Sequence, residues 1–123
     1  MCIRDRYWAN YFLSYFSHQD TLDVQSALKT AIVQTWDTYA AEFRIADDTL
    51  KERTLQNIFH DAVGFAGLEM LRRLIGAAHV KDIEGIVDIP RKLRAERAAL
   101  QFGTTLVKQH QSLRDVAAIL AML

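Results

Sequence analysis

Two adjacent arginines, Arg72 and Arg73, are the side chains of this sequence best suited to bind a ligand. A guanidinium group keeps its charge and presents several N–H donors, so it needs water, a carboxylate, or an anionic or hydroxyl-rich ligand. Neighbouring residues of a helix point about 100° apart. One arginine can therefore contact a ligand while the other pairs with a structural carboxylate, or both can flank one cleft.

An acidic residue close in sequence offers the arginine pair a different role. Glu69 precedes Arg72 by three residues and Arg73 by four, and side chains at these spacings are neighbours on a helix surface. A salt-bridge set is therefore an open alternative to ligand recognition. Asp61 lies eleven residues before Arg72 and cannot reach it without a bend in the helix, so it is a separate candidate.

His60 and His79 invite a catalytic interpretation, because histidine is a common general acid or base at neutral pH. Neither has a serine or cysteine nucleophile at a recognisable spacing, so we interpret both as structural or solvent-exposed. Cys2 is the only cysteine, which excludes an internal disulfide, and no Cys/His spacing is typical of a zinc site. We therefore predict no metal site within the chain.

The arginines lie in a segment, residues 61–80, that is apolar nearly all round and is typical of a buried helix. Gly64, Gly67 and Gly76 each cost roughly 0.5–1 kcal/mol relative to Ala in a helix interior. Close approach of another helix or of a ligand is the expected compensation. The capping-box spacing from Thr49 to Glu52 predicts the start of this helix, and its length suggests a bend or break near Gly64 or Gly67.

Four other segments complete a prediction of about five helices and an all-α fold. They cover residues 7–17, 22–44, a stretch from Asp88 and Pro90 to about His110, and a last helix after a second capping box at Ser112 to Asp115. The first has one strongly aromatic face, formed by Trp8, Tyr11, Phe12, Tyr15 and Phe16. We interpret this face as core, and expect it to be exposed if an N-terminal partner segment is missing.

Several of these runs resemble the C-terminal helical lobe of S-methyl-5-thioribose kinases, enzymes of methionine salvage. The similar runs are Asp61-Ala-Val-Gly-Phe-Ala-Gly67, Met70-Leu-Arg-Arg73, Ile75-Gly-Ala-Ala-His-Val80, and residues 9–17 and 34–43. The resemblance covers most of the chain from Trp8 onward and implies a protein-kinase-like fold, close to aminoglycoside phosphotransferases and choline kinases. It also implies that Arg72 and Arg73 bind the thioribose. His79 and Asp61 both lie in similar runs, and we keep them as lower-ranked candidate site residues.

The sequence lacks the parts that hold ATP and Mg²⁺ in kinase-like enzymes: the glycine-rich loop, the nucleotide-anchoring lysine, the His-Gly-Asp loop and the Asp-Pro-Glu segment. The resemblance therefore implies a C-terminal fragment that supplies sugar recognition, with catalytic and metal-binding residues upstream. Alone, it is expected to be inactive. Its partners would be 5-methylthioribose and the missing N-terminal part, and whether a homodimer forms is left open.

Composition limits the other functions. The 123 residues carry 15 basic and 15 acidic groups, so the chain has no excess of positive charge that would favour binding to nucleic acid or an anionic membrane. No signal peptide or membrane span is recognisable, so we expect a cytoplasmic protein. Residues 1–6 resemble translated adapter sequence and are expected to be a non-native leader, with the helical lobe in residues 7–123.

The alternative function is a standalone helical interaction module that docks a partner on its aromatic face. The basic cluster after Pro90 gives DNA binding little support.

Overall fold

The computed structural model describes residues 3–18, 21–75 and 86–123, and every regular element in this part is an α-helix. The helices are α1 Ile3–Ser17, α2 Leu22–Glu42, α3 Asp48–Ile75, α5 Ile89–Gln109 and α6 Val116–Ala121. The all-α prediction is confirmed. Helix α1 begins at Ile3 rather than Tyr7, and α2 ends at Glu42 because Phe43 adopts an extended backbone.

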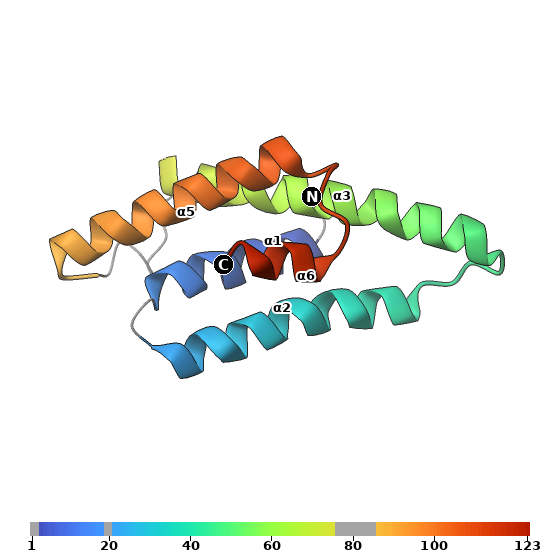
Figure 1. The fold of residues 1–123 in the computed structure, drawn as a ribbon, viewed down its shortest axis with the longest axis horizontal. Helices are drawn as coiled ribbons and strands as arrows, with labels where there is room; N and C mark the ends of the chain where they lie inside the picture. Colours follow the sequence, from blue (N-terminus) through green and yellow to red (C-terminus); the bar gives the residue numbers. More distant parts are fainter. Residues whose placement is uncertain (1–2, 19–20, 76–85) are drawn as a thin grey trace.

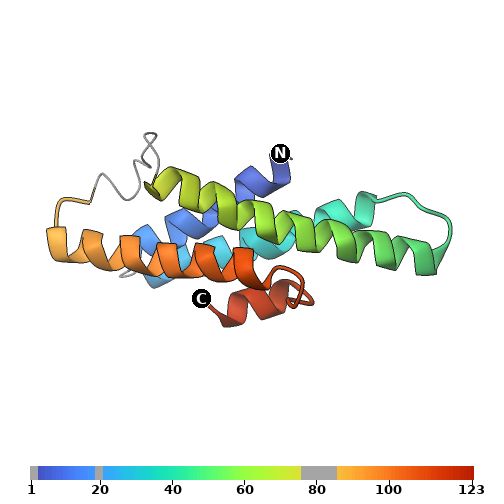
Figure 2. The ribbon, with the colours of Figure 1, turned by 90° about the horizontal axis from the view of Figure 1, so that it is seen from above.

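Helix α1 is the centre of the bundle, and it contacts α2, α3 and α5 (Figure 1). The two long helices α3 and α5 lie side by side and run in opposite directions (Figure 2). The short helix α6 packs against α2. None of the helices in the described residues is both long and apolar enough to cross a membrane.

The aromatic face of α1 forms the core of the bundle. Trp8 and Phe12 are completely buried, and the Phe12 ring lies 4.9 Å from that of Phe102 on α5. Trp8 contacts Phe59 of α3 at 5.9 Å between ring centroids and donates a hydrogen bond of 3.2 Å from Nε1 to the Ile32 carbonyl of α2. The interpretation of this face as core is confirmed. The expectation that it would be exposed without an N-terminal partner segment is wrong, because helices of the same chain cover it. The interaction-module alternative thereby loses its proposed docking face.

Helix α3 is continuous through both glycines at which a bend or break was expected. A Cβ atom on Gly67 would lie 2.7 Å from the Gly103 carbonyl oxygen of α5 and 2.9 Å from Val107 Cγ2. Gly67 therefore permits close packing of α3 on α5, as predicted for a glycine in this helix. Gly76 lies outside the described residues.

Acidic residues, rather than the predicted hydroxyl residues, cap two of the helices. The Asp47 carboxylate accepts a hydrogen bond of 3.0 Å from the Leu50 amide, so the start of α3 is capped two residues before Thr49. Asp115 accepts 2.9 Å from the Ala118 amide and caps α6, so the prediction that Ser112 starts the last helix is wrong. Carboxylates are effective N-caps because they accept orphan amide hydrogens and complement the helix dipole.

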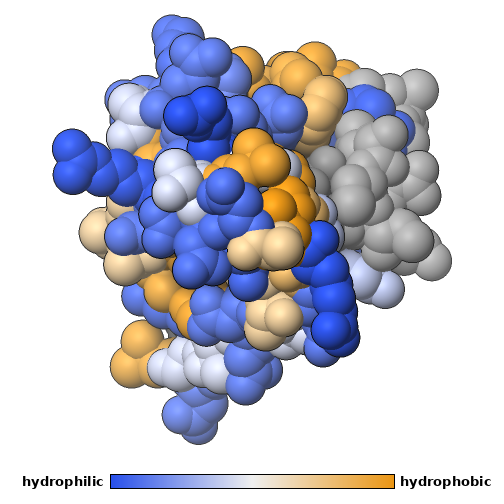
Figure 3. All heavy atoms as spheres, turned by 90° about the vertical axis from the view of Figure 1, so that its right-hand side faces the viewer, coloured by the Kyte–Doolittle hydropathy of each residue, from blue (hydrophilic) through white to orange (hydrophobic). Residues whose placement is uncertain are grey.

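The surface of this bundle mixes hydrophobic and hydrophilic residues. On the face at the end where α2 leads into α3, hydrophobic atoms are visible between hydrophilic side chains (Figure 3). Exposed hydrophobic residues of α3 include Phe65, Leu68 and Ile75, at 45%, 48% and 72% exposure. At these spacings they share one outward stripe of the helix, together with Arg72.

Candidate functional site

A single buried carboxylate organises the arginine pair. Glu69 lies on α3 and is only 3% exposed, which is unusual for a glutamate because a buried charge requires compensating partners. The sequence places Arg72 and Arg73 three and four residues further along the same helix, where both side chains can turn back onto Glu69. The charged part of the site is thus built from a short stretch of α3.

The contacts use two different geometries. Arg72 binds the carboxylate through two atoms, with Nε 2.9 Å from Oε2 and Nη2 2.5 Å from Oε1. Arg73 donates from Nε to Oε1 at 2.9 Å. Its Nη1 donates to the Oδ1 atom of Asn10 on α1, so this arginine joins the two helices. The salt-bridge set considered from spacing is therefore present, and it does not exclude ligand recognition.

The arginines hold Glu69 in its charged form. Hydrogen bonds from Arg72 are the largest influence on the carboxyl group; burial opposes them, and the hydrogen bond from Arg73 supports them. The result lowers the pKa of Glu69 from 4.5 to about 2. The same hydrogen bond raises the pKa of Arg72 above its ordinary value. Glu69 and Arg72 are consequently both ionised at neutral pH.

The two guanidinium groups differ in how much solvent they meet. The Arg72 side chain is 58% exposed and lies on the outer stripe of α3, whereas Arg73 is 22% exposed and faces α1. Within the described residues, Arg72 Nη1 and Arg73 Nη2 have no hydrogen-bond partner. These atoms are donors that a ligand can use.

Asn10 is the part of the cluster that sequence reasoning missed. It precedes Arg73 by 63 residues and is exposed on α1. No local pattern marks it, because its contact depends on how α1 crosses α3. Glu69, in contrast, was recognisable from helix spacing.

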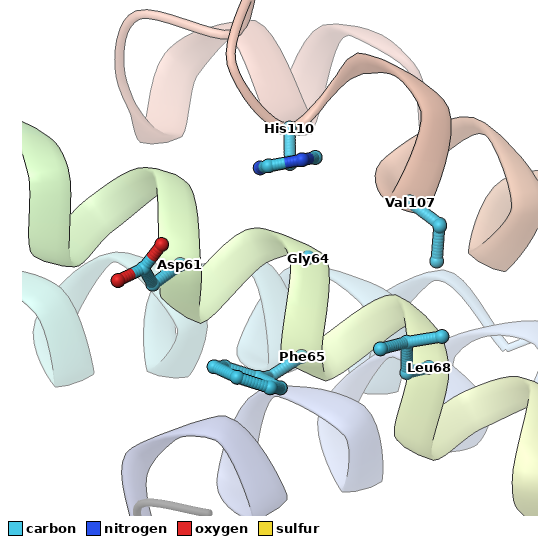
Figure 4. Close-up of a pocket in the computed structure, with 6 residues that line it drawn as sticks. All are labelled: Asp61, Gly64, Phe65, Leu68, Val107 and His110. Atoms are coloured by element: carbon cyan, nitrogen blue, oxygen red, sulfur yellow. The ribbon is translucent and has the colours of Figure 1, made fainter.

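Asp61 lies in a different place from the arginines. It is exposed and lines a groove of about 150 Å³ between α3 and the end of α5 (Figure 4). The remaining lining residues are mostly apolar: Gly64, Phe65, Leu68, Val107 and His110. The ring of His110 lies over Gly64, where an added Cβ would be 3.3 Å from its Cγ. Because α3 is continuous, Asp61 and Arg72 lie eleven residues, or about 16 Å, apart along the helix.

His60 is the one of the two histidines singled out from the sequence that lies in the described residues, and its hydrogen-bond contacts are structural. His60 Nε2 lies 2.8 Å from Gln56 Nε2 and 3.1 Å from the Leu113 carbonyl oxygen, which ties α3 to the segment before α6. His79 lies outside the described residues. The part of the chain that the structure covers places no three His, Cys, Asp or Glu side chains together as metal ligands.

The chain is thus a helical bundle that presents two oriented guanidinium groups on one long helix. Comparison with curated proteins finds methylthioribose kinases. That of Geobacillus sp. (strain WCH70) is 41% identical over 105 residues, covering 85% of this chain and 26% of the relative. Those of Bacillus mycoides (strain KBAB4) and Pectobacterium carotovorum subsp. carotovorum (strain PC1) are each 35% identical, over 119 and 97 residues.

The matched segment is a minor part of each relative. The chain spans 30% of the Bacillus mycoides kinase and 24% of the Pectobacterium kinase, but 88% and 70% of its own length is covered. No protein-family model matches the chain. The resemblance to thioribose kinases, inferred from the sequence, is confirmed as similarity to about a quarter to a third of these proteins.

Proposed function

We propose that this chain is the substrate-recognition part of an ATP-dependent kinase that phosphorylates 5-methylthioribose in methionine salvage. The similarity to methylthioribose kinases supports the reaction class. The observation that carries the role of this chain is the arginine cluster, in which Glu69 fixes two guanidinium groups while some of their N–H donors stay available. We further propose a kinase-like fold for the whole enzyme and a cytoplasmic location.

In this proposal Arg72 and Arg73 bind and orient the sugar and take no covalent part in the reaction. Their free N–H groups donate to sugar hydroxyls and hold the anomeric hydroxyl in line for attack on the γ-phosphoryl group. Their positive charge also stabilises negative charge that develops between ATP and the sugar. When bound, ATP supplies the phosphoryl group and Mg²⁺ neutralises its charge; we propose that residues outside this chain hold both.

Replacement of each arginine by alanine tests this role. The test protein is the Geobacillus kinase with its matching segment exchanged for this chain, hereafter the chimeric kinase. Arg72→Ala or Arg73→Ala should lower kcat/KM for methylthioribose at least about 100-fold, because each removes charge-assisted hydrogen bonds. The affinity for ATP, measured by calorimetry, should change less than about threefold.

Arg53→Ala is the matched control, since Arg53 is an exposed arginine on the same helix about 30 Å from the pair. It should leave both quantities unchanged. Circular dichroism separates loss of binding from loss of folding. A folded Arg72→Ala, Arg73→Ala double variant with normal kcat/KM would contradict the recognition role. Measurable phosphorylation by the 123-residue chain alone would contradict the assignment of catalysis to residues outside it.

A further inference from the structure

Glu69 stands between the two guanidinium groups and is the only carboxylate that contacts them within the described residues. We propose that Glu69 is a positioning and specificity residue, which orients both arginines and halves their combined charge so that they bind sugar hydroxyls in preference to phosphate. This inference rests on the proposed function of the pair. It assigns to the buried Glu69 side chain a role in disfavouring phosphate at the arginine site.

The orientation of the two guanidinium groups follows from which of their nitrogen atoms donate to Glu69. Both Nε atoms point at its carboxylate, so neither guanidinium can rotate freely about its long side chain. Arg72 is held by two bonds in one plane, which is the most restrictive geometry for an arginine–carboxylate pair. Asn10 restrains Arg73 from the side of α1. The remaining donors, Arg72 Nη1 and Arg73 Nη2, are therefore presented in fixed directions.

The selectivity follows from charge. Two guanidinium cations and one carboxylate leave one net positive charge in the cluster. Neutral hydroxyl groups need oriented donors and gain little from additional positive charge, whereas the binding of a phosphate depends strongly on it. A cluster of this charge can hold a sugar firmly and still release a phosphorylated product. Without the carboxylate, two positive charges would favour phosphate and retain the product.

Glu69→Gln separates these effects because it keeps the size of the side chain and removes its charge. In the chimeric kinase, calorimetry would give the dissociation constants of 5-methylthioribose and of inorganic phosphate. We expect phosphate binding to strengthen relative to sugar binding by at least about tenfold. Glu69→Asp keeps the charge but shortens the side chain, so it should weaken sugar binding while phosphate stays disfavoured. Glu52→Gln, an exposed glutamate on the same helix, is the matched control.

A second measurement uses the 123-residue chain itself and needs no ligand. In NMR spectra, the Nε–H signals of Arg72 and Arg73 should exchange slowly with water and should lose this protection in Glu69→Gln. Asn10→Ala leaves all charges in place and removes only the acceptor of Arg73 Nη1, so it should make the Arg73 guanidinium more mobile and leave Arg72 unchanged. Equal protection in wild type and Glu69→Gln would overturn the orienting role, even if the variant kinase proved too unstable to assay.

The outcomes distinguish the inference from the function on which it rests. If Arg72→Ala and Arg73→Ala leave sugar binding intact, the proposed function fails. If these substitutions abolish sugar binding but Glu69→Gln leaves the sugar-to-phosphate ratio unchanged, the proposed function stands and the selectivity role of Glu69 is wrong.

Discussion

At the scale of single residues, the ionisation of Glu69 is the property that the arginine pair controls most directly. Burial on its own raises the pKa of the Glu69 carboxyl group, because it disfavours the charged form. Hydrogen bonds from Arg72 and Arg73 reverse that tendency and bring the pKa of Glu69 to about 2. Arg72 meanwhile stays largely exposed, so water screens part of the interaction.

This pKa shift predicts how stability depends on pH. The folded pKa is below the unfolded value, so Glu69 stabilises the fold above about pH 4.5, and this contribution is lost as the pH falls toward about 2. After allowance for screening, we expect Glu69→Gln to lower the free energy of unfolding by roughly 2 kcal/mol near pH 6. The difference from wild type should nearly vanish near pH 2. Urea denaturation across this range is the measurement, and a pH-independent difference would contradict the assignment.

At the scale of secondary-structure elements, the two glycines where α3 meets α5 are not equivalent. A Cβ on Gly67 would be 2.7 Å from the Gly103 carbonyl oxygen and 3.0 Å from Leu106 Cβ, and the backbone oxygen cannot move away as a flexible side chain could. A Cβ on Gly103 would have its nearest neighbours at 3.4 Å, which is ordinary contact. The close approach therefore depends on Gly67.

Alanine substitution should expose this difference. Gly67→Ala is expected to destabilise the chain by about 2 kcal/mol, because separating the helices costs more than the roughly 1 kcal/mol that alanine gains in helix propensity. Gly103→Ala should be neutral within about 0.5 kcal/mol or slightly stabilising. Denaturation midpoints followed by circular dichroism give both values. A neutral result at Gly67 as well would show that the packing of α3 on α5 tolerates a methyl group on either helix.

At the scale of the whole molecule, α1 joins the other helices through its aromatic residues. Phe12 is completely buried and contacts both Trp8 of its own helix and Phe102 of α5. Trp8 extends the cluster to Trp36 of α2 and Phe59 of α3. The chain thus has a core of its own that links four helices, although it matches only part of its longer relatives.

Phe12→Ala tests whether this core holds the bundle together. Replacing a buried phenylalanine by alanine lowers the free energy of unfolding by about 3–5 kcal/mol. Because Phe12 lies at the shared centre, the loss should destabilise all the helices together. Tryptophan fluorescence and circular dichroism should then report the same unfolding transition at a lower urea concentration. Tyr7→Ala is the control, because Tyr7 is 50% exposed on the same helix and should cost less than about 1 kcal/mol. Separate transitions for the two signals would indicate that α1 is not the shared centre.

The sequence by itself determined what depends on neighbours along one helix. Apolar periodicity predicted the all-α architecture, and the three- and four-residue spacings identified Glu69 as the partner of Arg72 and Arg73. Only the tertiary structure decided which helices cover the aromatic face of α1 and that Asn10 supports Arg73. The physical reason is that helix geometry fixes contacts within a few residues, whereas contacts between distant residues depend on how helices cross, which no local spacing encodes.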